Sequence, residues 1–112
     1  MADEVSIWQM TEAELLAEVI SRCERRTIRW VHIDTPHHNK KRQNLTGFPD
    51  LFLCGRTRIA FRELKKQYSR TSSPQQTTWK YALLAAGQDW DIWLPSDLVS
   101  GRIDRELDSL CA

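Results

Sequence analysis

The stretch "GFPDLFLCGRTRIAFRELKK", residues 47–66, decides the fold of this chain. Two runs rich in apolar residues, "DLFLC" and "TRIAFREL", flank a Gly-Arg pair, which predicts two antiparallel strands joined by a hairpin. Ionisable residues stand at the ends of these runs: Asp50 opens the first, and Glu63 and Lys65 close the second. Charged groups are costly to bury at the rim of a core, so their placement indicates a site.

Because side chains alternate along a strand, the turn decides which of them share a face. A two-residue turn at positions 55 and 56 predicts that position 54 pairs with 57 and position 50 with 61. The residues that then share one face are Asp50, Ile59, Phe61, Glu63 and Lys65. The apolar members predict that this face is turned toward the core. Asp50 and Glu63 become diagonal neighbours, with backbones roughly 7–8 Å apart.

Two carboxylates at this spacing repel each other and resist desolvation. A divalent cation that prefers oxygen ligands relieves both problems, and Mg²⁺ or Mn²⁺ suits such a pair. The alternative is that Asp50 simply opens a strand after Pro49, while Glu63 forms a salt bridge with a neighbouring lysine. Glu12 is a third candidate, because it lies three and four residues before Leu15 and Leu16 and points along their apolar stripe.

Outward from the hairpin, helical and strand patterns alternate. A helix is predicted from Thr11, which forms a capping box with Glu14, and a strand over 27–33. Residues 34–47 carry turn residues and charge without a period, so a long loop is expected. A second helix begins at Ser73-Pro74, ends before Gly87, and buries a stripe. That stripe is Trp79, Ala82, Leu83 and Ala86. A fourth strand and a short terminal helix follow.

Charge is distributed unevenly, although the net charge of the 112 residues is only +1. Residues 37–70 hold nine Lys or Arg against two carboxylates, a net charge of +7, and both flanks are acidic. This distribution has two interpretations. The basic segment forms one face that binds a polyanion, or it is simply a run of charges exposed to solvent.

Length and composition are typical of one globular domain over residues 1–112. We expect no membrane segment and no signal peptide, because no apolar run is long enough and the first ten residues lack a basic and an apolar region. The three cysteines are far apart and predict neither a disulfide framework nor a metal site. A cytoplasmic protein is expected, in the host cytoplasm if a phage encodes it.

The pattern Pro49-Asp50, twelve residues, then Glu63-Leu64-Lys65 resembles the PD-(D/E)XK nuclease signature. With "SPQQTTW" and "AAGQDWDIW" behind it, the chain resembles the VRR-NUC family over residues 11–98. The resemblance implies an α/β fold: a restriction-endonuclease-like αβββαβ core, whose mixed four-stranded sheet is flanked by helices.

Site roles follow from the resemblance residue by residue. Asp50, Glu63 and the Leu64 carbonyl oxygen would ligate Mg²⁺ or Mn²⁺, Lys65 would act on the attacking water, and Gln76 would lie near the site. Glu12 would match a first-helix glutamate. The family often has glutamine four residues after that glutamate, where this chain has Leu16, and an apolar residue where this chain has Arg62. By its position alone, Gln76 is a capping-box residue, and it can hold both roles.

The loop before the site supplies candidate DNA contacts. They are His38, Asn39, Lys40, Lys41 and Arg42, with Lys66 after the site. Cationic side chains of this kind grip backbone phosphates without reading sequence. The loop histidines can also be metal ligands, although partners at metal spacing are absent from the sequence around them.

Two classes of function remain open. The first is a metal-dependent DNA endonuclease that acts on branched or four-way junction DNA, as the resemblance implies, and works as a homodimer. The second is a non-catalytic nucleic-acid-binding module on a nuclease fold. The apolar residues of the last segment predict either a dimer contact helix or a helix packed on its own domain. They are Leu98, Val99, Ile103, Leu107 and Leu110.

Overall fold

The computed structural model describes residues 4–33, 45–69 and 71–112. Most of the predicted loop lies outside the described residues, and with it the predicted DNA contacts His38, Asn39, Lys40, Lys41 and Arg42. The elements are α1 (Glu4–Gln9), α2 (Glu12–Arg25), β1 (Arg29–His32), β2 (Leu51–Cys54), β3 (Ile59–Leu64), α3 (Pro74–Ala85), β4 (Trp90–Trp93), α4 (Pro95–Val99) and α5 (Arg102–Cys111). None of the helices in these ranges is long and apolar enough to cross a membrane.

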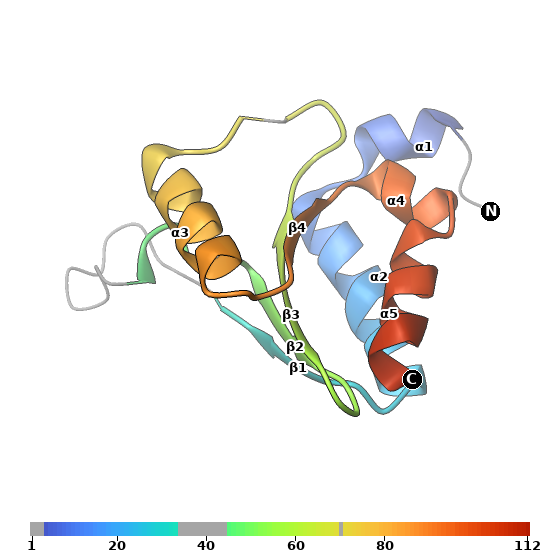
Figure 1. Cartoon of the computed structure of the whole chain (residues 1–112). Helices are drawn as coiled ribbons and strands as arrows, with labels where there is room; N and C mark the ends of the chain where they lie inside the picture. Colours follow the sequence, from blue (N-terminus) through green and yellow to red (C-terminus); the bar gives the residue numbers. More distant parts are fainter. Residues whose placement is uncertain (1–3, 34–44, 70) are drawn as a thin grey trace.

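The four strands form one mixed sheet in the order β1-β2-β3-β4. β1 and β3 are antiparallel to β2, whereas β3 and β4 are parallel. A parallel pair needs a crossover, which α3 supplies on one face of the sheet, while α2 and α5 cover the other face (Figure 1). The chain is therefore an α/β fold with a mixed four-stranded sheet flanked by helices, as predicted. The sequence does not predict the short helices α1 and α4.

Both principal helices begin where their caps predict. The Thr11 side chain accepts a hydrogen bond from the Glu14 N–H, and the Glu14 carboxylate accepts one from the Thr11 N–H, each at 3.0 Å. Ser73 and Gln76 make the same reciprocal pair at the start of α3, with Pro74 in its first turn. These bonds satisfy N–H groups that a helix start otherwise leaves without partners.

The core has two parts, one on each face of the sheet. The larger part lies against α2 and α5 and contains Leu15, Val19, Leu51, Leu53, Leu64, Trp93, Ile103 and Leu107. The smaller part lies against α3 and contains Phe61, Leu83 and Trp90, with Phe48, Phe52, Ile59 and Trp79 packed on it. The face of Ile59 and Phe61 is thus turned toward the smaller part, and the main core lies on the opposite face.

The predicted buried stripe of α3 is wrong in part. Leu83 is buried and Trp79 is half-buried, but Ala82 and Ala86 are exposed. The Trp79 ring meets the Phe48 ring edge-on, with centroids 4.8 Å apart. The helix contacts the rest of the domain mainly through large side chains, so its alanines stay on the solvent side.

The predicted hairpin register is also wrong, by two residues. Cys54 pairs with Ile59 and Leu51 with Arg62, so the loop holds four residues rather than two. The Gly55 N–H donates to the Arg58 carbonyl at 2.9 Å, and the Arg56 N–H donates to the Leu110 carbonyl at 2.8 Å. The end of α5 therefore holds the loop open, a contact that turn chemistry alone does not reveal.

The apolar face of α5 is used within the domain. Ile103 and Leu107 are fully buried and Leu110 is 2% exposed. Asp104 and Asp108 bind Arg26 of the chain segment after α2, at 2.9 and 2.7 Å. The second interpretation of this segment, a helix packed on its own domain, therefore describes α5.

Candidate functional site

Asp50 and Glu63 face each other across the end of the β2–β3 pair. The register that pairs Leu51 with Arg62 places Asp50 directly across from Glu63, closer than the predicted diagonal. Because the error in register is two residues, the alternation of faces is preserved and the two carboxylates still share a face. Asp50 is held on both sides: its Oδ2 accepts a 2.7 Å hydrogen bond from the Leu64 N–H, and its carbonyl accepts one from Ile33 at 2.8 Å.

The Glu63 side chain is buried beside this partner, with 3% of the residue exposed. Its Oε1 accepts a 3.1 Å hydrogen bond from the Gln76 amide, but its Oε2 is buried and has no hydrogen-bond partner among the described residues. Burial raises the pKa of Glu63 to about 9, and the neighbouring Asp50 carboxyl adds to the rise. A proton held between the two carboxyls, or a bound cation, would satisfy Oε2.

Lys65 and Gln76 complete a chain of hydrogen bonds to Glu63. The Lys65 ammonium donates to the Gln76 side-chain oxygen at 3.0 Å and to the Thr71 carbonyl at 2.8 Å, and the residue is only 6% exposed. The same Gln76 oxygen accepts the Ser73 N–H at 3.0 Å. Gln76 therefore caps α3 and bridges Lys65 to Glu63 at once, so the two interpretations of this residue hold together.

Gly47 brings the segment before Asp50 against the start of α3. Its φ is +80°, and a Cβ added there would lie 2.4 Å from the Gln75 carbonyl carbon and 2.6 Å from the Gln76 nitrogen. Only glycine permits both the backbone conformation and this approach. Gly47 thus fixes the spacing between the Asp50 segment and the helix that carries Gln76.

Glu12 lies at the start of α2 and shares a cavity with Asp50. Glu12, Leu16, His32, Asp50 and Leu64 line a cavity of about 210 Å³. Partial burial raises the pKa of Glu12, the Asp50 charge adds to the rise, and the Lys65 and Lys66 charges oppose it. In the described ranges, no three His, Cys, Asp or Glu side chains are grouped closely enough to hold a metal ion. Asp50 and Glu63 face each other as a pair, and Glu12 shares a cavity with Asp50.

Lys66 is the one predicted DNA contact that the structure describes. It follows Lys65 at the end of β3, is half-buried, and its ammonium lies 5.8 Å from the centre of the Tyr68 ring. Tyr68 is 63% exposed. A cation beside an exposed aromatic ring suits contact with a phosphate and a base.

Sequence reasoning missed a buried polar cluster on the other face of the sheet. Arg62 is 3% exposed and donates to the Glu106 carboxylate at 2.9 Å, while its guanidinium lies 5.1 Å from the centre of the Trp93 ring. The Trp93 indole N–H donates to the same Glu106 oxygen at 3.0 Å. The sequence carried one signal for this cluster, a charged residue among the apolar residues of a strand. Because side chains alternate along a strand, Arg62 lies on the face opposite Glu63.

Comparisons of the chain with protein-family models, with curated proteins and with solved structures find no match.

Proposed function

We propose that this chain is a metal-dependent DNA endonuclease built on a PD-(D/E)XK-like αβββαβ core of the VRR-NUC type. The observation that carries the proposal is the carboxylate pair Asp50 and Glu63, with a buried Glu63 oxygen that lacks a partner among the described residues. The order of α2, the first three strands, α3 and β4 supports it, since the same order frames the signature in that superfamily.

The residues fit a hard divalent cation. Asp50 and Glu63 provide oxygen ligands, the Leu64 carbonyl is the further ligand that the resemblance implies, and the Glu63 oxygen without a partner is the group that a cation would satisfy. When bound, Mg²⁺ or Mn²⁺ would polarise a phosphate oxygen and lower the pKa of a coordinated water. Glu12 shares a cavity with Asp50 and is the third carboxylate that the resemblance implies.

The remaining groups have roles that their contacts support. The Lys65 ammonium places a positive charge beside the carboxylate pair, where negative charge develops on a phosphate during hydrolysis. Gln76, at the start of α3, holds both Lys65 and Glu63 by hydrogen bonds. Burial of these side chains makes each charge count for more than it would in water. The DNA backbone phosphates would be bound by Lys66 and by the basic loop with Lys40, Lys41 and Arg42.

A homodimer acting on branched DNA is the form of the activity that we favour. The described part of the chain carries one such carboxylate pair, and two strands of a junction are cut most simply by two copies related by a two-fold axis. Since the apolar face of α5 is buried in its own domain, the contact between copies would use another surface.

The test is a cleavage assay on labelled duplex, flap and four-way junction DNA with Mg²⁺ or Mn²⁺. The wild-type chain is expected to cut at least one of these substrates and to stop when the metal is chelated. Glu63→Ala should abolish cleavage, whereas Glu24→Ala removes an exposed carboxylate from α2 and should leave the rate unchanged. Equal rates in wild type and Glu63→Ala would remove Glu63 from the site.

A further inference from the structure

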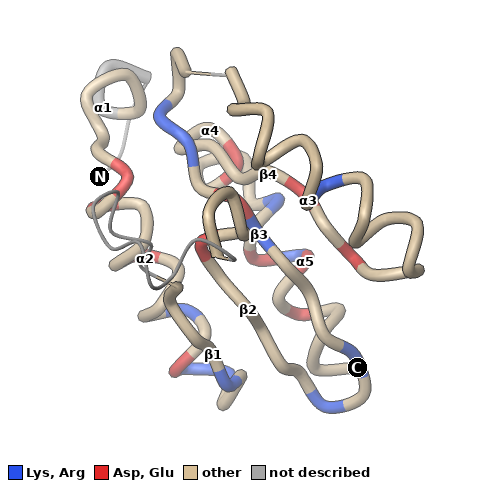
Figure 2. The backbone as a smooth tube through the Cα atoms, turned by 90° about the vertical axis from the view of Figure 1, so that its left-hand side faces the viewer, with Lys and Arg blue, Asp and Glu red and all other residues tan. Residues whose placement is uncertain are grey.

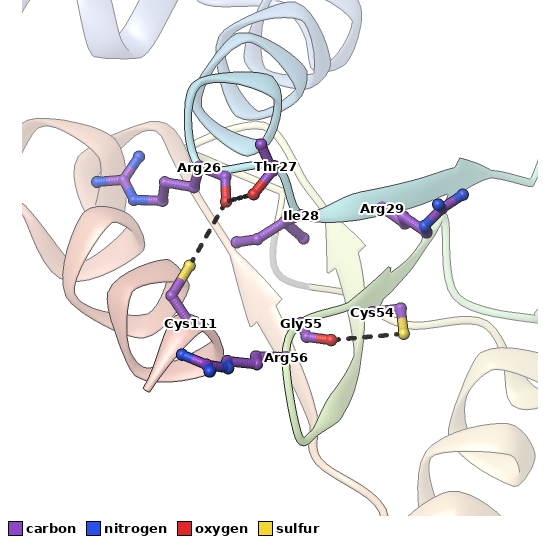
Figure 3. Close-up of a pocket in the computed structure, with 8 residues that line it drawn as sticks. All are labelled: Arg26, Thr27, Ile28, Arg29, Cys54, Gly55, Arg56 and Cys111. Atoms are coloured by element: carbon purple, nitrogen blue, oxygen red, sulfur yellow. Dashed lines mark hydrogen bonds between the residues drawn. The ribbon is translucent and has the colours of Figure 1, made fainter.

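A second cavity, of about 420 Å³, lies at the other end of the sheet, where α2, the hairpin loop and α5 end (Figure 3). Arg26, Arg29 and Arg56 are among the residues that line it. Figure 2 shows Lys and Arg positions at the tip of the β2–β3 hairpin, at this end of the molecule. The hairpin loop that forms part of the cavity wall is held against the end of α5. The Arg56 N–H donates to the Leu110 carbonyl, and Gly55 lies so close to this carbonyl that a Cβ at position 55 would overlap its oxygen.

Two of the three arginines are available to a ligand. Arg26 is held by Asp104 and Asp108, which neutralise it. Arg29 and Arg56 are exposed, and within the described part of the chain no carboxylate pairs with either of them. Exposed guanidinium groups at the rim of a cavity are suited to phosphate oxygens.

The backbone beside the cavity is strained. Thr27 has φ +56° at the end of α2, a left-handed conformation that glycine normally takes there. The turn lets the Ile28 N–H reach the Cys23 carbonyl at 2.9 Å, and it places Arg26 and Arg29 on the wall of one cavity. This conformation is sterically unfavourable for a β-branched residue, and backbone strain of this kind gathers at functional sites.

The directions of the guanidinium groups point to an extended ligand. In Figure 3, Arg26 and Arg56 extend toward the side of α5, whereas Arg29 extends in the opposite direction. A single compact anion needs donors that converge on one point, and these do not. A polyanion with charges at regular intervals can be met by donors spread along a rim.

The edge strand β1 connects this cavity with the candidate site. Arg29, its first residue, lines the cavity of the arginines, and His32, its last, lines the cavity that also holds Glu12 and Asp50. Three residues of strand span about 10 Å, or about three steps of a nucleic-acid strand at about 3.4 Å each. Arg29, Val31 and His32 are all exposed along this edge.

We infer that a nucleic-acid strand runs along β1 from the Asp50–Glu63 pair to Arg29 and Arg56, which bind its backbone phosphates. The inference rests on the proposed function in taking DNA as the polyanion, but it concerns binding rather than cleavage. Arg29 and Arg56 are the binding residues in this arrangement, while Arg26 stays paired with Asp104 and Asp108.

The test is the salt dependence of binding to a 20-base-pair duplex, measured by fluorescence anisotropy on the full chain with metal chelated. Arg29→Gln and Arg56→Gln should each reduce the slope of log K against log salt by about 0.9. Arg105→Gln removes one charge from the exposed side of α5 and should leave the slope unchanged. Equal slopes in wild type and both cavity variants, or no binding by wild type, would overturn the inference.

Two further arms separate the alternatives. Inorganic phosphate at constant ionic strength should compete no better than chloride, and saturable phosphate binding that is lost in Arg56→Gln would show a compact-anion pocket and overturn the extended path. A wild-type chain that binds with the expected slopes but does not cleave DNA would defeat the nuclease proposal and leave the β1 path supported.

Discussion

Asp50 and Glu63 lie across from each other at the end of the β2–β3 pair, and the Leu64 N–H fixes Asp50 by a 2.7 Å hydrogen bond. The Glu63 oxygen that is left without a partner among the described residues is buried next to this carboxylate. Without a cation, the pair is relieved by holding a proton. This gives the pair a pH dependence that can be measured in the metal-free protein.

The metal-free chain should lose stability as pH rises from 6 to 8. In the unfolded chain, Glu63 ionises near its ordinary pKa of 4.5, whereas burial and Asp50 raise its folded pKa to about 9. Between these values the folded state binds one more proton, so the free energy of unfolding falls by up to about 1.4 kcal/mol per pH unit. Urea denaturation at several pH values, with chelator present, should show that the unfolding free energy of the wild type falls with a slope against pH that Glu63→Gln lacks. Identical slopes in the two proteins would contradict the raised pKa.

Much of this pair could be predicted from the sequence, because strand parity survives an error of two residues in register. The caps at Thr11 and Ser73 were also readable, since capping is local chemistry. The four-residue hairpin loop was not, because the Leu110 carbonyl of α5 holds it open from a distance of fifty-four residues along the chain. Local patterns also cannot reveal which face of the sheet receives the larger core.

Lys65 should act on the rate of cleavage rather than on metal binding. Lys65→Met keeps a long side chain but removes the cation that Gln76 holds beside Glu63. We expect the single-turnover rate to fall by about 10²–10³-fold, as for the loss of one group that stabilises a transition state. Lys66→Met is the matched control: it should weaken DNA binding and leave the rate at saturating DNA unchanged. A large loss of rate in both variants would argue against a special role of Lys65.

Gly47→Ala and Gly87→Ala form a matched pair, because both glycines have a left-handed φ near +80°. A Cβ at position 87 meets no atom within 4 Å, so this variant should lose only about 1 kcal/mol of stability. A Cβ at position 47 overlaps the backbone of Gln75 and Gln76, so we expect a further loss of about 1–3 kcal/mol. Denaturant unfolding measures both. Equal losses would mean that the Asp50 segment is not pressed against α3.

Arg62→Ala should destabilise the fold without touching the chemistry. It removes the buried partner that helps keep the pKa of Glu106 low against the effect of burial. Breaking a buried ion pair on one side costs about 3–5 kcal/mol. Arg62→Met fills the space beside Trp93 and should cost less. At a temperature where both variants are folded, cleavage by the chain should match wild type, and a selective loss of activity would place Arg62 in the site.

The most direct measurement is a titration of Mn²⁺ into the full chain, followed by the electron paramagnetic resonance signal of the free ion. The wild-type protein should bind Mn²⁺ through Asp50 and Glu63, and both Asp50→Asn and Glu63→Gln should weaken that binding at least about tenfold, because each removes a charged ligand. Glu24→Gln, which changes an exposed carboxylate of α2, should bind as wild type does. Equal Mn²⁺ affinity in wild type and Glu63→Gln would contradict the assignment of this carboxylate pair as a metal site.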